Sequence, residues 1–198
     1  MGRVAMKMIS CQRGLSLLEL LVSVVVFSIG LLGIAGLQMV SKQANYEGSQ
    51  RTLAAQVAYG LLEDMRTNGS GISIYVAAND LGGGSLAGLP VAQCRDPNTP
   101  CSHAQKAVHD LWYWERMVDG AAELGVEGQS GGILFPTVCV DGPAGGIAGI
   151  YAVSIAWRGG IELANPEASQ CGAGSGNYGD GDRFRRVLQV ATFIDPNI

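Results

Sequence analysis

An uninterrupted apolar stretch near the N-terminus constrains this chain more than any other feature. Residues 20–37 contain no charged side chain, and their only polar side chains are the hydroxyls of Ser23 and Ser28. A helix of about 20 residues crosses the roughly 30 Å hydrocarbon layer of a bilayer. The stretch therefore predicts a membrane-spanning helix.

Basic residues flank this stretch unequally. Arg3, Lys7 and Arg13 precede it without any acid among the first fourteen residues, and Lys42 is the first base after it. Lys and Arg are enriched on the cytoplasmic side of membrane helices. We therefore expect a cytoplasmic N-terminus and a C-terminal part on the other side of the membrane.

Three interpretations of this N-terminal region compete. A secretory signal would be cut after the apolar stretch, for example after Ala35, and a simple signal anchor would not be cut at all. The third interpretation depends on Glu19, because a carboxylate costs on the order of 2.5–3.5 kcal/mol at the bilayer centre and less near its edge. A cut after Gly14 would free an α-amine on Leu15, and this cation could neutralise Glu19 of a neighbouring chain.

The motif at residues 14–19, GLSLLE, resembles the class III signal of type IV prepilins and type II secretion pseudopilins. The resemblance implies cleavage by prepilin peptidase between Gly14 and Leu15, N-methylation of Leu15, and a role for Glu19 in subunit assembly. The family usually has Phe or Met after the cut, but the position tolerates several apolar residues. The resemblance divides the chain into a class III leader peptide at residues 1–14, a transmembrane and assembly helix at 15–40, and a periplasmic pilin-like globular domain at 41–198.

Residues 27–38, a later cysteine pair and the sequence DLW at residues 110–112 resemble minor pilins of the PilV group, the type IV pilus modification proteins. This resemblance implies a single-pass protein of the inner membrane that moves into the pilus fibre at the cell surface. The implied partners are prepilin peptidase, other minor and major pilins, the inner-membrane pilus assembly machinery and inner membrane lipid. A pseudopilin of type II secretion is the alternative, since its N-terminal chemistry is the same.

Helical spacing continues beyond the apolar stretch. Leu53, Val57, Leu61 and Met65 recur at this spacing, with polar residues mostly between them, and residues 67–71 have the composition of a helix end. One helix over residues 16–66 would be about 75 Å long at 1.5 Å per residue. We expect its second half to lie on a globular domain.

The middle of the chain predicts a loop followed by a helix. Residues 70–103 are rich in Gly, Asn and Pro, as long loops are, and residues 102–124 predict a helix that begins at the cap Ser102. Asp110 and Glu115 are expected to lie mainly outside its apolar face, and the aromatic cluster at residues 112–114 to pack in the core with one ring exposed. The apolar face itself consists of Ala107, Leu111, Trp114 and Val118.

Three apolar segments near the C-terminus predict β-strands, at residues 133–140, 150–157 and 187–194. The first two are expected to pair antiparallel through the connection at residues 141–149. The predicted fold class is α+β: a long N-terminal α-helix, half transmembrane and half amphipathic, packed on a C-terminal antiparallel β-sheet in a pilin-like roll.

The cysteines divide by position. Cys11 lies in the basic leader, whereas the four cysteines that follow the apolar stretch are an even number, which fits two disulfides in an oxidising compartment. Three pairings are possible. We favour Cys94 with Cys101 as a local closure, and Cys139 with Cys171 as a longer one.

Charge and composition argue against several other functions. The formal net charge is −4, and removal of the basic leader would make the remainder more acidic, so we expect no nucleic acid partner. We interpret Arg183, Arg185 and Arg186 as a solvated strand edge. Ser, His and Asp residues are present, but no catalytic constellation supports an enzyme, so we expect neither an enzyme nor a cofactor.

We expect no metal site either. No CxxC-like pair suits zinc, and His103 and His109 are six residues apart, on poorly matched faces of a helix. Asp180 and Asp182, with Asn177, have oxygen ligands that calcium could use, but their spacing differs from an EF-hand. A solvated loop is the interpretation that we favour there.

Overall fold

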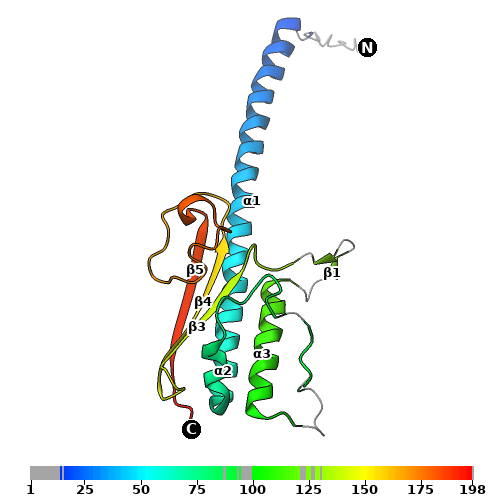
Figure 1. Cartoon of the computed structure of the whole chain (residues 1–198). Helices are drawn as coiled ribbons and strands as arrows, with labels where there is room; N and C mark the ends of the chain where they lie inside the picture. The colour runs from blue at the N-terminus through cyan, green and yellow to red at the C-terminus, as the bar shows by residue number, and fades with distance from the viewer. Residues whose placement is uncertain are drawn as a thin grey trace, which may run out of the picture. The chain divides into compact units, whose positions relative to one another are not determined.

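The computed structural model describes residue 14 and residues 16–86, 88–92, 94, 100–120, 124–125, 128–129 and 131–197. The chain divides into two compact units, Met1–Ala44 and Asn45–Ile198. Figure 1 shows the elements in chain order: the long helix α1 (Leu17–Thr67), the short helix α2 (Ile72–Ala77), the helix α3 (His103–Val118), and the strands β3 (Thr137–Asp141), β4 (Gly149–Arg158) and β5 (Arg185–Ile194).

The helix α1 covers Leu17–Thr67, which confirms the long helix that the sequence predicts. Its buried residues begin only at Gln50, and all of its residues up to Tyr46 are exposed. Beyond Gln50 the buried side chains recur at helical spacing, so this part of α1 has one face toward a core. That face consists of Ala54, Val57, Ala58, Leu61, Leu62 and Met65.

The sheet of the second unit is antiparallel, with the order β3-β4-β5. Its strands are β3 at Thr137–Asp141, β4 at Gly149–Arg158 and β5 at Arg185–Ile194. The pairing of the first two strands is confirmed, with Val138 opposite Ile155. Residues 153–157 of the central strand β4 are all buried, because both faces of the sheet are covered there. A separate pair of two-residue strands joins β1, Leu124–Gly125, to β2, Gly128–Gln129.

The core lies between one face of the sheet, the apolar face of α1 and the helices α2 and α3. Its buried members include Val153 and Ile155 from β4, Tyr75 from α2, and Leu111 from α3, all at most 4% exposed. Each fully buried aliphatic side chain stabilises the fold by about 1.5–3 kcal/mol. The α+β fold predicted from the sequence is therefore present, with the C-terminal half of α1 in the core.

Two element predictions need correction. The expected loop at residues 70–103 begins with the 3₁₀ turn η1, Gly69–Gly71, and the helix α2, Ile72–Ala77, which buries Ile72 and Tyr75. The helix α3 covers His103–Val118 and so ends six residues before the predicted position. It stops because Gly120 has φ +76°, and a Cβ there would lie 1.8 Å from the carbonyl oxygen of Gly131. Its start is as expected: Ser102 and Gln105 form a capping box.

Two disulfides close loops of the second unit. Cys94 is bonded to Cys101, and Cys139 on β3 is bonded to Cys171. These are the two pairs that the sequence analysis favoured. The second bond lies in a small buried cluster with Ala156 and Tyr178, on the sheet face opposite to the main core. The loop that precedes β5 therefore covers part of that face.

Candidate functional site

The start of α1 carries the motif that the sequence analysis singled out. Gly14 and Ser16 are exposed, whereas Leu15, Cys11 and the bases Arg3, Lys7 and Arg13 lie outside the described residues. The Ser16 hydroxyl accepts a hydrogen bond from the Glu19 backbone N–H at 3.2 Å, and the Ser16 carbonyl accepts one from the Leu20 N–H. Ser16 thus acts as the helix cap: its side chain satisfies the otherwise free amide of Glu19, and its carbonyl accepts the first regular bond of the helix.

Glu19 occupies the first turn of this helix, and its side chain is exposed. The positive end of the helix dipole favours a carboxylate at this position, by about 0.3–1 kcal/mol on a surface. That is less than the cost of placing a carboxylate in hydrocarbon. Within one chain, the helix dipole therefore offsets only part of the free energy that it costs to place the Glu19 carboxylate in a membrane.

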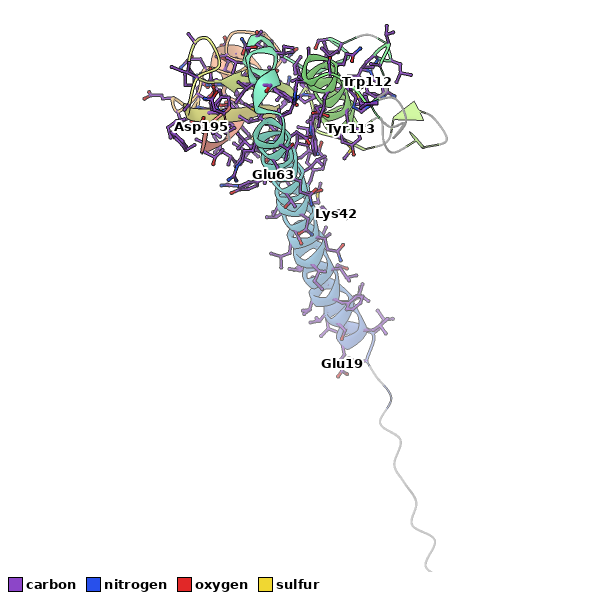
Figure 2. The ribbon with its side chains drawn as sticks, turned by 90° about the horizontal axis from the view of Figure 1, so that it is seen from below. Glu19, Lys42, Glu63, Trp112, Tyr113 and Asp195 are labelled. Atoms are coloured by element: carbon purple, nitrogen blue, oxygen red, sulfur yellow. A yellow bond between two sulfur atoms is a disulfide. The ribbon has the colours of Figure 1, made fainter. Side chains whose placement is uncertain are left out.

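From Leu17 to Val40 the surface of α1 is apolar except for Glu19, Ser23, Ser28 and Gln38, and the stretch between Glu19 and Lys42, both labelled in Figure 2, carries no charge. Its large side chains are exposed by 50–77%, and an 18-residue window has a mean hydropathy of 2.6 with none of it buried. Such a helix is long and apolar enough to cross a membrane.

The two serine hydroxyls inside this apolar surface bond to the helix itself. The Ser23 hydroxyl donates to the Glu19 carbonyl at 2.7 Å, and the Ser28 hydroxyl donates to the Val24 carbonyl at 2.7 Å. Both hydroxyls are therefore satisfied without water, as a helix in lipid requires.

Small residues share a stripe of the helix with Glu19. Viewed along the helix axis, with a rotation of 100° per residue, Ser23, Gly30 and Gly33 lie within about 40° of the direction of Glu19. A Cβ at Gly30 or Gly33 would meet nothing within 4 Å, so both glycines face open space. A second apolar helix could therefore approach the backbone closely along the stripe that carries the carboxylate.

The second unit contains buried carboxylates that sequence reasoning placed elsewhere. Asp110 on α3 is 8% exposed; it accepts hydrogen bonds from the Tyr75 hydroxyl at 2.5 Å and from the Lys106 ammonium at 2.6 Å. Burial, with the adjacent Asp110, raises the pKa of Tyr75 above its ordinary range. Trp114 donates its indole N–H to Asp64 of α1 at 2.7 Å. These bonds join α1, α2 and α3 to one another.

Glu115 and Asp119 hold the glycine-rich loop at residues 82–86. The Glu115 carboxylate, 2% exposed, accepts from the N–H groups of Gly82 and Leu86 and from the Ser85 hydroxyl. Asp119 accepts from the N–H groups of the two glycines that follow Gly82. The loop therefore folds around carboxylates of its own chain.

The arginine cluster is not the solvated edge that the sequence suggested. Arg183 is exposed, but Arg185 is 1% exposed, and the side chain of Arg186 is 13% exposed. Arg185 is buried because the loop before β5 wraps around its guanidinium. It donates to the carbonyls of Pro166, Ser169 and Cys171 and to the Asn165 side chain at 2.5–2.8 Å.

The loop considered for calcium has its own hydrogen bonds. Asp182 accepts from the Gly174 N–H at 2.8 Å, while Asp180 is exposed. His103 bonds to Asn68 at 2.7 Å, and His109 lies 3.8 Å from Asp110. Within the described ranges, no group of three or more His, Cys, Asp or Glu residues could hold a metal ion.

Sequence comparisons agree with the features of α1. Residues 9–35 match a family model described as a prokaryotic N-terminal methylation motif, and residues 36–112 match one described as Tt1218-like, type IV pilin Tt1218. No curated protein and no solved structure matches the chain. The methylation motif contains the whole segment from Gly14 to Glu19 and most of the apolar helix.

Proposed function

Because residues 9–112 carry the N-terminal methylation motif and the match to a type IV pilin, we propose that this chain is a minor pilin of a type IV pilus, of the PilV kind. Prepilin peptidase cuts it after Gly14 and methylates the new N-terminus at Leu15. The subunit then enters the fibre or primes its assembly together with other minor and major pilins. The observation that carries the proposal is Glu19 at the start of a helix whose surface is otherwise apolar.

The proposed mechanism has three steps. The apolar part of α1 first holds the precursor in the inner membrane as a single pass, with residues 41–198 in the periplasm. Cleavage then frees the amine of Leu15. In the fibre, that amine meets Glu19 of a neighbouring subunit, and the pairing offsets the cost of the carboxylate in an apolar surrounding.

The small-residue stripe supports the last step. Glu19, Gly30 and Gly33 lie on one side of α1, and both glycines are open to solvent in the isolated chain. A neighbouring helix that packs against the glycines would lie over Glu19 as well. Apolar contacts and the ion pair would therefore form in the same movement out of the lipid.

Mass spectrometry of the mature N-terminus in a pilus preparation tests the processing step. We expect a chain that begins with N-methylated Leu15. A chain that begins at Met1, or after Ala35, would contradict the proposal, because a signal anchor or a conventional secretory signal would then explain the apolar stretch.

Substitution of Glu19 tests the assembly step. We expect Glu19→Ala to be cleaved and to accumulate in the inner membrane but to be nearly absent from fibres, whereas Glu19→Asp retains part of the incorporation. Glu63→Ala is the matched control, because Glu63 is an exposed acid of the same helix that pairs with the exposed Arg66 at 3.6 Å. Equal incorporation of Glu19→Ala and wild type would refute the electrostatic step.

A pseudopilin of type II secretion is the second candidate, because residues 9–35 suit it equally. Deletion of the gene separates the two. Loss of surface pili with normal protein secretion supports the minor pilin, and loss of secretion with normal pili supports the pseudopilin.

A further inference from the structure

One edge of the main sheet is open. The strand β3 is bridged on its outer side by Leu81, which exchanges two backbone hydrogen bonds with Val138 at 3.0 and 2.7 Å. The strand β5 is at the opposite edge and pairs only with β4 among the described strands (Figure 1). The edge of β5 is therefore the place where this sheet can be extended.

The hydrogen bonds of the sheet identify the outward-facing backbone groups of β5. Arg158 N donates to Leu134 O on the β3 side of β4, and Val138 bonds outward to Leu81. In an antiparallel ladder the direction alternates from residue to residue. Arg158 points its N–H toward β3, so Arg185 opposite it forms no hydrogen bond with it. Starting from Arg185, the N–H and C=O groups of every second residue of β5 therefore point away from β4. These residues are Val187, Gln189, Ala191 and Phe193.

These outward groups are accessible and lack a partner. Every residue of β5 from Arg186 to Phe193 is at least partly exposed. No described residue forms a hydrogen bond with the outward backbone groups of residues 187–193. An extended strand, with its regular spacing of donors and acceptors, is the form of peptide that can satisfy such a row.

The edge also lacks the protection that sheet edges usually have. Natural edge strands are short, or carry Lys, Pro or a bulge that prevents further pairing. In contrast, β5 has 10 residues, pairs one-to-one with β4 without a bulge, and has neither charge nor proline from residue 187 to 194. Such an edge is suited to pairing with another strand.

The surroundings of this edge indicate what the added strand must contain. Ile150 and Phe193 face each other across β4 and β5 and are 61% and 59% exposed. Arg183 precedes β5, but it already pairs with Glu162 at 3.4 Å and its carbonyl accepts from the Leu163 N–H, whereas the acid Asp195 follows β5 (Figure 2). A complementary strand is uncharged in its middle, offers an apolar side chain beside Phe193, and has a base at the end near Asp195.

A second copy of this chain does not fit that description. Its β3 edge is occupied by Leu81. If two β5 edges paired antiparallel, the two copies would be related by a two-fold axis perpendicular to the strands. Residues 45–67 of α1 would then run in opposite directions in the two copies. Both copies would enter the same membrane through that helix, so the reversal is incompatible with their anchoring.

We propose that the edge of β5 binds an extended segment of a different polypeptide, which pairs with Val187, Gln189, Ala191 and Phe193 as an additional strand of the sheet. The inference goes beyond the proposed function, and it does not depend on cleavage after Gly14. The bound segment satisfies the open backbone groups and packs beside Phe193.

Photocrosslinking on the full-length protein in its native cells tests this proposal. A benzophenone amino acid replaces Gln189, Ala191 or Phe193 in turn, and mass spectrometry identifies the residue to which each is joined. We expect the three positions to crosslink to residues that are two apart along one segment of another protein, as in a paired strand. Steps of three or four, as on a helix, would overturn the proposal, as would crosslinks to β5 of a second copy or no crosslinked peptide at all.

Two variants of Ala191 separate edge pairing from mere proximity. Ala191→Pro removes an outward N–H and leaves the β4 ladder intact, whereas Ala191→Val keeps the N–H and raises strand propensity. With the benzophenone at Gln189, we expect crosslinking to fall at least tenfold in the proline variant and to persist in the valine variant. Equal crosslinking in both would overturn the proposal.

Folding and processing are checked in the same samples. Formation of both disulfides shows that the proline variant has folded; if it has not, Phe193→Lys, which places a charge on the exposed edge, replaces it with the same expected loss. The digest also reports the N-terminal peptide. A chain that begins at Met1 counts against the proposed minor pilin alone, and a chain that begins at Leu15 without strand crosslinks counts against this inference alone.

Discussion

Replacement of Arg185 tests how the loop before β5 is held. Its guanidinium is buried and bonds to the carbonyls of Pro166, Ser169 and Cys171 and to the amide oxygen of Asn165. Each hydrogen bond that involves a charged group contributes about 1.5–3 kcal/mol, and bonds in one network do not add fully. We expect Arg185→Ala to lower the free energy of unfolding by about 3–5 kcal/mol, which is a large part of the roughly 5–15 kcal/mol typical of a domain.

Lysine provides a graded comparison at the same position. Its ammonium keeps the charge and three donors, but it lacks the planar fork that reaches several carbonyls at once. We therefore expect Arg185→Lys to lose less than the alanine variant, about 1–3 kcal/mol. Arg183→Ala is the matched control, because Arg183 is exposed and its 3.4 Å pair with Glu162 is worth at most about 1 kcal/mol.

The assay is urea unfolding of the purified full-length protein in detergent, with both disulfides intact. Tryptophan fluorescence reports on the second unit, where all three tryptophans of the chain lie. A loss of about 4 kcal/mol lowers the midpoint by roughly 1.5–4 M at ordinary slopes. An Arg185→Ala protein within about 1 kcal/mol of wild type would refute the reasoning, because the buried carbonyls would then be satisfied without the guanidinium.

Three further predictions concern the second unit. Glu115→Ala should lower the free energy of unfolding by about 2–4 kcal/mol in the same urea assay, because buried amides of the loop that it holds lose their acceptor. Gly60→Val should lower the thermal midpoint, because a Cβ there lies 2.2 Å from the Trp114 ring, whereas Gly48→Ala, with nothing within 4 Å, should leave it unchanged or raise it. Burial raises the pKa of Tyr75, so above about pH 10 the folded state keeps a proton that the unfolded state loses. The free energy of unfolding should therefore fall as the pH rises past about 10, and it should fall less steeply in Tyr75→Phe. Urea titrations below and above about pH 10 measure both slopes.

Long periodic elements could be predicted from the sequence because many residues contribute to one signal. The helix predicted at residues 16–66 is present at Leu17–Thr67, and the three predicted strands lie within a few residues of β3, β4 and β5. In contrast, α2 has 6 residues, fewer than two helical turns, so no periodicity could reveal it. The early end of α3 depends on a close approach to Gly131, far along the chain.

The buried polar residues could not be predicted, because their burial depends on loops rather than on spacing. Asp110 and Glu115 lie beside the apolar face of α3, and α2 and the loop at residues 82–86 cover them. Arg185 is one of several arginines in a short run, and only the loop wrapped around it distinguishes it from Arg183. The N-terminal motif differs from these cases: its meaning depends on residue order and on the adjacent apolar helix, both of which the sequence contains.

The contacts of α1 with late parts of the chain bear on the order in which this protein can fold. Glu47 accepts a hydrogen bond from the N–H of Gly160, 113 residues later, and the apolar face of α1 shares its core with Ile194 near the C-terminus. A nascent chain therefore carries an incompletely covered apolar helix face for most of its synthesis. Contacts between residues so far apart in the sequence also form slowly. Until the last strand emerges, that core lacks the contacts of β5, so release of an incomplete chain would leave it partly open to aggregation.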